Sequence, residues 1–400
     1  MRAERYRRIL GIRDARQPML GAVIDRIPIA AMGLSTILLI RAETGSFAIA
    51  GLVEAAVAIS IAVSLPIQGR LIDRVGQTEV LSVALILNPL ALIALVLAAR
   101  GGAGAVPLAA IGALTGATVP ATGSCMRALW SRLIPDPGLR QSAYAIDSVS
   151  LEAAFIVGPL VTAVLVAVGS PTLAVLVNAG FATLGTFVFV VSHASRTWRG
   201  QAGPRGWAGP LRSRGIVVLV VIELAGGAAL GAMEISITAF ATGEGHSSLA
   251  GVLIAVQAAA SLAGGLWYGA RHRGTDAADR YARLCLLTVV GFVPLLLTTS
   301  IEEALPLMAL SGFALAPSGT VLFTLVDELS PPGTATESFT WMITSITAGV
   351  AAGSAIGGAL VTGGHPHRGF AATVAASAVA CVVAYAGRPR LRLATRAASA

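Results

Sequence analysis

Runs of apolar residues about 20 residues long alternate with short polar joints from residue 18 to residue 386. A bilayer core of about 30 Å is crossed by roughly 20 residues of α-helix, and a helix satisfies its own backbone hydrogen bonds in lipid. The pattern therefore predicts an all-α integral membrane protein with twelve transmembrane helices. The expected spans are 18–40, 46–68, 79–99, 104–126, 143–166, 172–192, 215–238, 248–270, 281–300, 304–326, 336–361 and 369–386.

The longest polar joint, 193–214, separates the first six spans from the last six. We therefore expect an N-terminal six-helix bundle at 1–192, a linker at 193–214, a C-terminal six-helix bundle at 215–386 and a tail at 387–400.

The placement of arginine predicts the orientation of these helices. Arginines gather at the amino terminus, in every second joint and in the tail, whereas the opposite joints hold only Arg41, Arg100 and Arg368. Because positive charge stays on the cytoplasmic side, both termini and the linker are expected in the cytoplasm. The protein is expected in the cell membrane as a multi-pass protein.

Part of the first half of the chain returns in the second half. Residues 115–135 reappear as 311–331, a displacement of 196 residues, and nearly the same displacement carries Gly158 onto Gly353. The matched pairs include Leu129 with Leu325, Leu133 with Leu329 and Pro135 with Pro331. Duplicated membrane units are the usual basis of transporter folds with a binding site between the halves. The sequence therefore predicts two six-helix bundles related by internal duplication, and a transporter.

The composition is typical of a membrane protein and argues against several other classes of protein. Hydrophobic residues make up 55% of the chain and charged residues 12%, against roughly a quarter charged in soluble proteins. The arginines form no face with interleaved aromatic residues, so no nucleic-acid partner is expected. The three cysteines are far apart and the histidines lie in joints, so neither a metal site nor a cofactor is expected. We find no P-loop, H-E-x-x-H or nucleophile elbow, and therefore expect no enzyme.

One joint carries a recognisable motif. The residues after the second span are Gly69-Arg70-Leu71-Ile72-Asp73-Arg74-Val75-Gly76. Gly69 and Gly76 permit close helix approach and a tight turn. Asp73 can accept hydrogen bonds from the amino-terminal end of another helix, where free N–H groups favour an anion.

This motif resembles the G-x-x-x-D-R-x-G signature of the major facilitator superfamily. The resemblance implies that Asp73 contacts helix 11 near Thr334–Ser338 and latches the cytoplasmic side in an outward-open state, with Arg74 or Arg127 completing a charge cluster. The alternative is a solvated turn that only aids insertion. In the repeat of this motif in the second half, Gly269 stands at the position of the acid. The latch is therefore expected from the first copy of the motif only.

Span 5 resembles the g-x-x-x-G-P-x-x-G-G pattern of drug–proton antiporters in that superfamily through Gly158 and Pro159. Its repeat in span 11 keeps Gly349, Gly353 and Gly357 at four-residue spacing, which lets helix backbones touch. Plain helix packing explains the glycines equally well. The arginine that such antiporters often carry in span 4 is missing from the frame Leu108, Gly112, Thr115 and Gly116.

A charge inside a membrane span is expensive and marks a candidate functional site, and seven candidates stand out. They are Asp25, Arg26, Glu54, Asp147, Glu152, Glu223 and Glu234. A carboxyl group in such a place can bind a proton or a cationic substrate on one side of the membrane and release it on the other. Alternatively Arg26 pairs with a carboxylate and the remaining acids lie at span ends. Glu152, near the middle of its span, and Glu223 are the first candidates, and Glu234 is expected on the stripe of Glu223.

The leading hypothesis is a secondary active transporter that exports a small organic, drug-like molecule in exchange for protons by alternating access. There are two alternatives. The first is an importer or uniporter on the same fold, and the second is a membrane sensor that transports nothing. The expected partners are a small-molecule substrate, protons and the lipid bilayer, and the functional unit is expected to be a monomer.

Overall fold

The computed structural model describes residues 2–199, 209–245, 249–269, 276–361 and 365–397. All regular elements within these residues are helical, and twelve helical units among them are long and apolar enough to cross a membrane. They confirm the all-α membrane fold and the twelve predicted spans, and the chain is a multi-pass membrane protein.

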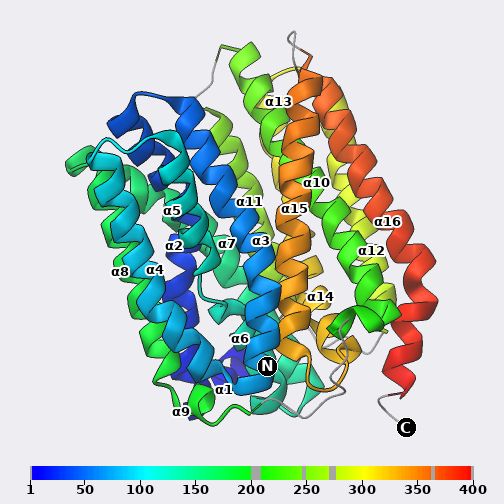
Figure 1. Ribbon diagram of the computed structural model, residues 1–400. Helices are drawn as coiled ribbons and strands as arrows, with labels where there is room; N and C mark the ends of the chain where they lie inside the picture. Colours follow the sequence, from blue (N-terminus) through cyan, green and yellow to red (C-terminus); the bar gives the residue numbers. More distant parts are fainter. Residues whose placement is uncertain (1, 200–208, 246–248, 270–275, 362–364, 398–400) are drawn as a thin grey trace.

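The twelve units follow one another as an up-and-down succession of helices (Figure 1). They are α2 (Arg13–Thr44), α3 (Phe47–Val75), α4 (Gln77–Arg100), α5 (Ala105–Ala117) with α6 (Thr122–Leu133), α7 (Pro137–Val168), α8 (Pro171–Val190), α10 (Arg214–Gly243), α11 (Leu249–Gly269), α12 (Ala277–Phe292) with the 3-10 turn η2 (Val293–Leu297), α13 (Ile301–Gly312) with α14 (Leu315–Leu329), α15 (Ala335–Val361) and α16 (Pro366–Ala397). Three short elements accompany them, namely α1 (Arg2–Gly11), α9 (His193–Arg196) and η1 (Gly209–Arg212).

The fourth and tenth spans are each broken into two helices, which the sequence analysis did not foresee. Pro120 lies in the first break and has no N–H to continue the helix. The Gln68 side chain donates a hydrogen bond of 2.8 Å to the freed carbonyl oxygen of Val119. After the second break the backbone N–H of Ala316 donates to the Ser261 hydroxyl at 3.0 Å. Side chains of neighbouring helices thus satisfy backbone groups that the breaks release, as lipid requires.

Glycines let two pairs of helices approach closely, at places related by the duplication. A Cβ on Gly158 of α7 would lie 2.8 Å from the Ile27 carbonyl oxygen of α2. A Cβ on Gly357 of α15 would lie 3.0 Å from Ala232 of α10, and Gly349 and Gly353 meet α10 in the same way. Since α10 and α15 repeat α2 and α7, the two halves pack with one internal geometry. Pro159 follows the first of these glycines within α7.

Three hydrophobic core clusters show where the halves are joined. Figure 1 places both ends of the chain at one end of the molecule, which we call the termini side. The largest cluster lies there and draws on both halves, for example Trp130 and Tyr144 with Phe323 and Phe339. At the opposite side, one cluster belongs to the first half and the other to the second. The halves are therefore packed against each other at the termini side and have separate cores beyond it.

Candidate functional site

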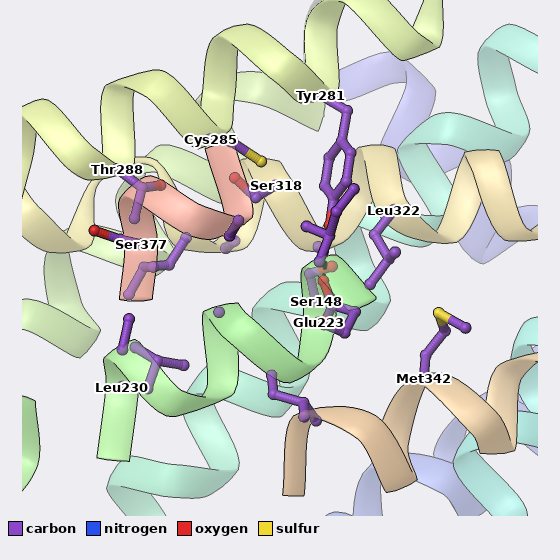
Figure 2. Close-up of a pocket in the computed structure, with 18 of the residues that line it drawn as sticks. Ser148, Glu223, Leu230, Tyr281, Cys285, Thr288, Ser318, Leu322, Met342 and Ser377 are labelled. Carbon is purple, nitrogen blue, oxygen red and sulfur yellow. Dashed lines mark hydrogen bonds between the residues drawn. The ribbon is translucent and has the colours of Figure 1, made fainter. Parts of the chain in front are cut away.

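A cavity of about 220 Å³ lies mainly within the second half of the chain, between α10, α12, α14, α15 and α16. From the first half only α7 contributes to its wall, through Ser148, Leu151 and Glu152. Most of the lining is aliphatic or aromatic (Figure 2). The polar side chains in the wall are Ser148, Glu152, Glu223, Tyr281, Thr288, Ser318 and Ser377.

Glu223 of α10 is the first of two carboxylates in this wall. It is half-buried, and the Tyr281 hydroxyl of α12 donates a hydrogen bond of 2.7 Å to its Oε1 (Figure 2). Cys285 and Thr288 follow Tyr281 along the same face of α12 and also line the cavity. The sequence analysis missed Tyr281, although a tyrosine, a cysteine and a threonine at helical spacing in an apolar span are a usable signal.

Glu152 of α7 is the second carboxylate, and it comes from the other half. It is half-buried. Ser148 lies one turn away on the same helix face and also lines the cavity. One carboxylate from each half therefore faces the same cavity.

Two further predicted acids do not line it. Glu234 shares a helix stripe with Glu223, but α10 contributes to the wall only as far as Leu230, and Glu234 is exposed. Glu234 therefore lies outside the described wall of this cavity although it shares the stripe of Glu223. Glu54 of α3 is half-buried, with Oε1 3.0 Å from the place that a Cβ on Gly33 would take.

A buried ion-pair cluster lies in the first half, outside the cavity wall. Asp147 of α7 binds two guanidinium groups, those of Arg26 on α2 and Arg127 on α6. The bond from Arg127 Nε to Asp147 Oδ2 measures 2.7 Å, and Arg26 also donates to Ser150. All three charged side chains are at most 3% exposed. Arg26 therefore pairs with a carboxylate, as in the alternative interpretation of the charges inside the spans.

Asp25, the neighbour of Arg26, is buried beside this cluster. It accepts hydrogen bonds from the hydroxyl groups of Thr122 on α6 and, at 3.4 Å, Thr186 on α8. The cluster thus ties four helices of the first half together. Its buried acids do not lie at span ends in contact with water, because neighbouring side chains enclose them.

The motif around Asp73 differs from expectation in its local structure. It was expected in a loop, but α3 continues through Val75, so that only Gly76 lies outside the helix, at φ +119°. The Asp73 carboxylate is buried and accepts hydrogen bonds from the backbone N–H groups of Thr336, at 3.1 Å, and Glu337, at 2.9 Å. These residues begin α15, the eleventh span. The free N–H groups of a helix start and its dipole both favour an anion in this position.

Close helix approach makes that contact possible. A Cβ on Gly69 would lie 2.6 Å from the Thr340 hydroxyl oxygen and 2.8 Å from the Glu337 Cα. Any side chain at this position would push α3 away from α15 and stretch the bonds to Asp73.

A different arginine from those expected completes this contact. Arg74 is exposed, and Arg127 binds Asp147. Arg70 instead donates to Glu337 Oε1 at 2.6 Å. The sequence analysis missed this pair because Glu337 is distant in the sequence and shows no motif of its own.

Other contacts between the halves also lie on the termini side. Tyr144 of α7 packs against Phe323 of α14 and Phe339 of α15 with ring centroids 6.2 Å apart in each case. The Arg127 guanidinium lies 4.2 Å from the centroid of the Phe323 ring. Polar pairs join Arg140 to Asp327 at 3.0 Å and Arg280 to Gln141 at 3.3 Å. Because Phe323 also lines the cavity, this aromatic layer separates the cavity from the termini side.

Comparison with known proteins agrees with this architecture. The family model described as the Major Facilitator Superfamily matches residues 19–345, so the chain belongs to that superfamily and is a membrane transporter. No curated protein sequence matches the chain significantly.

Solved structures share the fold at low sequence identity. A bacterial homologue of the iron transporter ferroportin in its outward-facing state has a TM-score of 0.77 at 15% identity, covering 94% of this chain and 99% of that chain. The human organic anion transporter MFSD10 (TETRAN) has a TM-score of 0.72 at 17% identity, with the same coverage of 94% and 99%. The E. coli fucose:proton symporter FucP has a TM-score of 0.71 at 12% identity, covering 92% and 97%. These TM-scores show that the three structures share the fold of this chain.

Proposed function

We propose that this transporter exports small amphiphilic organic molecules in exchange for protons by alternating access. The observation that carries the proposal is the pair Glu152 and Glu223, one carboxylate from each half, facing one apolar cavity. When the halves rock, Glu152 moves with the first half and Glu223 with the second, so the surroundings of both carboxylates change in each cycle. A group whose surroundings alternate in this way can take up a proton on one side and release it on the other.

The cavity wall also limits the class of substrate. Its described lining holds two acids, several hydroxyl groups and many apolar side chains, and no arginine or histidine. Such a wall binds neutral or cationic amphiphiles better than anions, because an anion would meet two carboxylates without a compensating positive charge. Under this proposal the substrate class differs from that of the organic anion transporter with the same fold.

We assign the Asp73 contact to the latch that holds the termini side closed. With both termini in the cytoplasm, as the arginine pattern predicts, this arrangement is the outward-open state of a transporter in the cell membrane. The bundles 1–192 and 215–386, the linker 193–214 and the tail 387–400 are proposed as its working parts, in a functional monomer. The glycines of α7 and α15 keep each bundle rigid while the halves move.

One observation supports import or uniport as the second candidate function. Gly112 occupies the place of the arginine that antiporters of this superfamily often use. A Cβ there would lie 2.9 Å from the Val53 side chain, so α5 and α3 pack too closely for a long side chain. Coupling through that position is therefore closed to this protein, and any proton coupling must use other groups.

The test is a resistance screen in an efflux-deficient bacterium with a panel of neutral, cationic and anionic amphiphiles. We expect resistance that a protonophore abolishes and that Glu152→Gln or Glu223→Gln reduces at least tenfold. Glu234→Gln is the matched control, since it lies on α10 but outside the cavity wall. Resistance that survives the protonophore and both cavity substitutions would exclude proton-driven export through this site. Uptake of a compound instead of resistance would establish the second candidate.

A further inference from the structure

The duplicated motif has lost its acid in the second half of the chain. A displacement of 196 residues carries Asp73 onto Gly269, which lies at the termini-side end of α11. By the same symmetry, the contact between α3 and the start of α15 corresponds to one between α11 and the start of α7. Gly269 has no side chain with which to make that contact.

Other groups make a contact at this place. The Tyr6 hydroxyl of α1 donates a hydrogen bond of 3.0 Å to the Leu266 carbonyl oxygen of α11. The Ser142 hydroxyl, near the start of α7, donates one of 2.8 Å to the Gly269 carbonyl oxygen. Both bonds cross from the first half to the second. The roles of donor and acceptor are reversed relative to Asp73, since here side chains donate and the backbone of α11 accepts.

Local packing is built around the absence of a side chain at Gly269. A Cβ there would lie 2.6 Å from the Tyr6 hydroxyl oxygen and would also meet Ala145 of α7. Burial raises the pKa of Tyr6, so its hydroxyl keeps the proton that it donates. An acid at position 269 would displace Tyr6. An acidic contact like that of Asp73 and the Tyr6 contact therefore exclude each other at this place.

Helix α1 is held in place as a separate element. Ile9 is 1% exposed and belongs to the core cluster shared by the two halves. Ile12, with ψ 108°, interrupts the helical backbone between α1 and α2, so α1 is not a rigid extension of the first span. It also precedes residue 19, where the match to the superfamily begins.

We propose that Tyr6, Ser142 and Gly269 form a second latch on the termini side, in which α1 replaces the missing acid of the duplicated motif. The first latch joins α3 to α15, and the second joins α1 and α7 to α11. Both must release before the cavity opens towards the termini side. The N-terminal helix is therefore part of the gate of the transporter.

The rate at which Cys285 is alkylated tests this proposal, because Cys285 lines the cavity behind the gate. Cys125 and Cys381 are replaced by alanine, and a membrane-impermeant maleimide is added only on the side that carries the termini. Loss of one hydrogen bond shifts an equilibrium about fivefold, so Tyr6→Phe should accelerate alkylation about fivefold. Ser142→Ala should have a similar effect, and the two together a larger one.

The control is Tyr385→Phe, which removes a tyrosine hydroxyl from α16 far from α11 in the sequence. We expect its alkylation rate to equal that of the parent. Unchanged rates in Tyr6→Phe and in the double variant would overturn the second latch. Equal acceleration from both sides of the membrane would also overturn it, because this indicates general loosening instead of gate opening. The assay needs no transported compound, so its outcome is independent of the proposed substrate and coupling.

Discussion

Replacing Asp73 by asparagine should release the termini side of the transporter. The carboxylate accepts two hydrogen bonds from the start of α15, at 3.1 and 2.9 Å. An amide keeps one oxygen and turns its NH₂ group towards the second N–H, so at least one of these bonds is lost. Hydrogen bonds to charged groups contribute about 1.5–3 kcal/mol each. In the open state water solvates the side chain, so the loss falls on the closed state and raises the ratio of open to closed molecules by about 10- to 150-fold.

Distances between two spin labels would measure this ratio. Arg74 in the first half and Arg390 in the second are exposed on the termini side and can be replaced by labelled cysteines in a protein without other cysteines. In the parent we expect one short distance, and in Asp73→Asn a second, longer distance of comparable population. Asp14→Asn is the control, since Asp14 is exposed near the same end of the molecule. An unchanged distance distribution in Asp73→Asn would refute the argument that these two bonds hold the gate.

Three further predictions concern the contacts of Gly69, Asp147 and Tyr281. Gly69→Ala should also populate the long distance, because the added Cβ meets α15, whereas Gly51→Ala on the same helix has nothing within 4 Å and should behave as the parent. Asp147→Asn leaves two buried arginines without their carboxylate, which costs about 3–5 kcal/mol, so thermal unfolding in detergent should shift down by several degrees or more. A variant as stable as the parent would show that the cluster contributes little. Tyr281→Phe removes the hydroxyl that donates to Glu223, so the apparent KM for export should change about fivefold. The control Tyr385→Phe should leave this KM unchanged. Equal KM values would remove Tyr281 from the site.

The hydrophobic pattern was sufficient to predict the fold, because in lipid a long apolar segment has few alternatives to a helix. Each predicted span overlaps a described helix, and errors are confined to ends and breaks. The break at Pro120 was missed because apolar residues continue through it. The motif at Gly69–Gly76 was placed in a loop because its charges ended the apolar run, although the helix continues into the polar region.

The site was less predictable than the fold, because contacts between distant helices leave no local pattern. The sequence identified Glu152 and Glu223 as first candidates, and both line the cavity. It gave no sign that Asp147, which also lies within a span, is bound by two arginines from other helices. The pair of Arg70 with Glu337 joins residues 267 positions apart and was missed for the same reason.

The uneven division of the cavity wall has an evolutionary consequence. Five helices of the second half enclose the cavity, whereas the first half supplies a single helix to it and carries the buried ion-pair cluster. Mutations in α10, α12, α14 and α16 can therefore diversify the substrates that the protein accepts while the ion-pair cluster of the first half remains unchanged. A chimaera that pairs this first half with the second half of a homologue should inherit the homologue's selectivity.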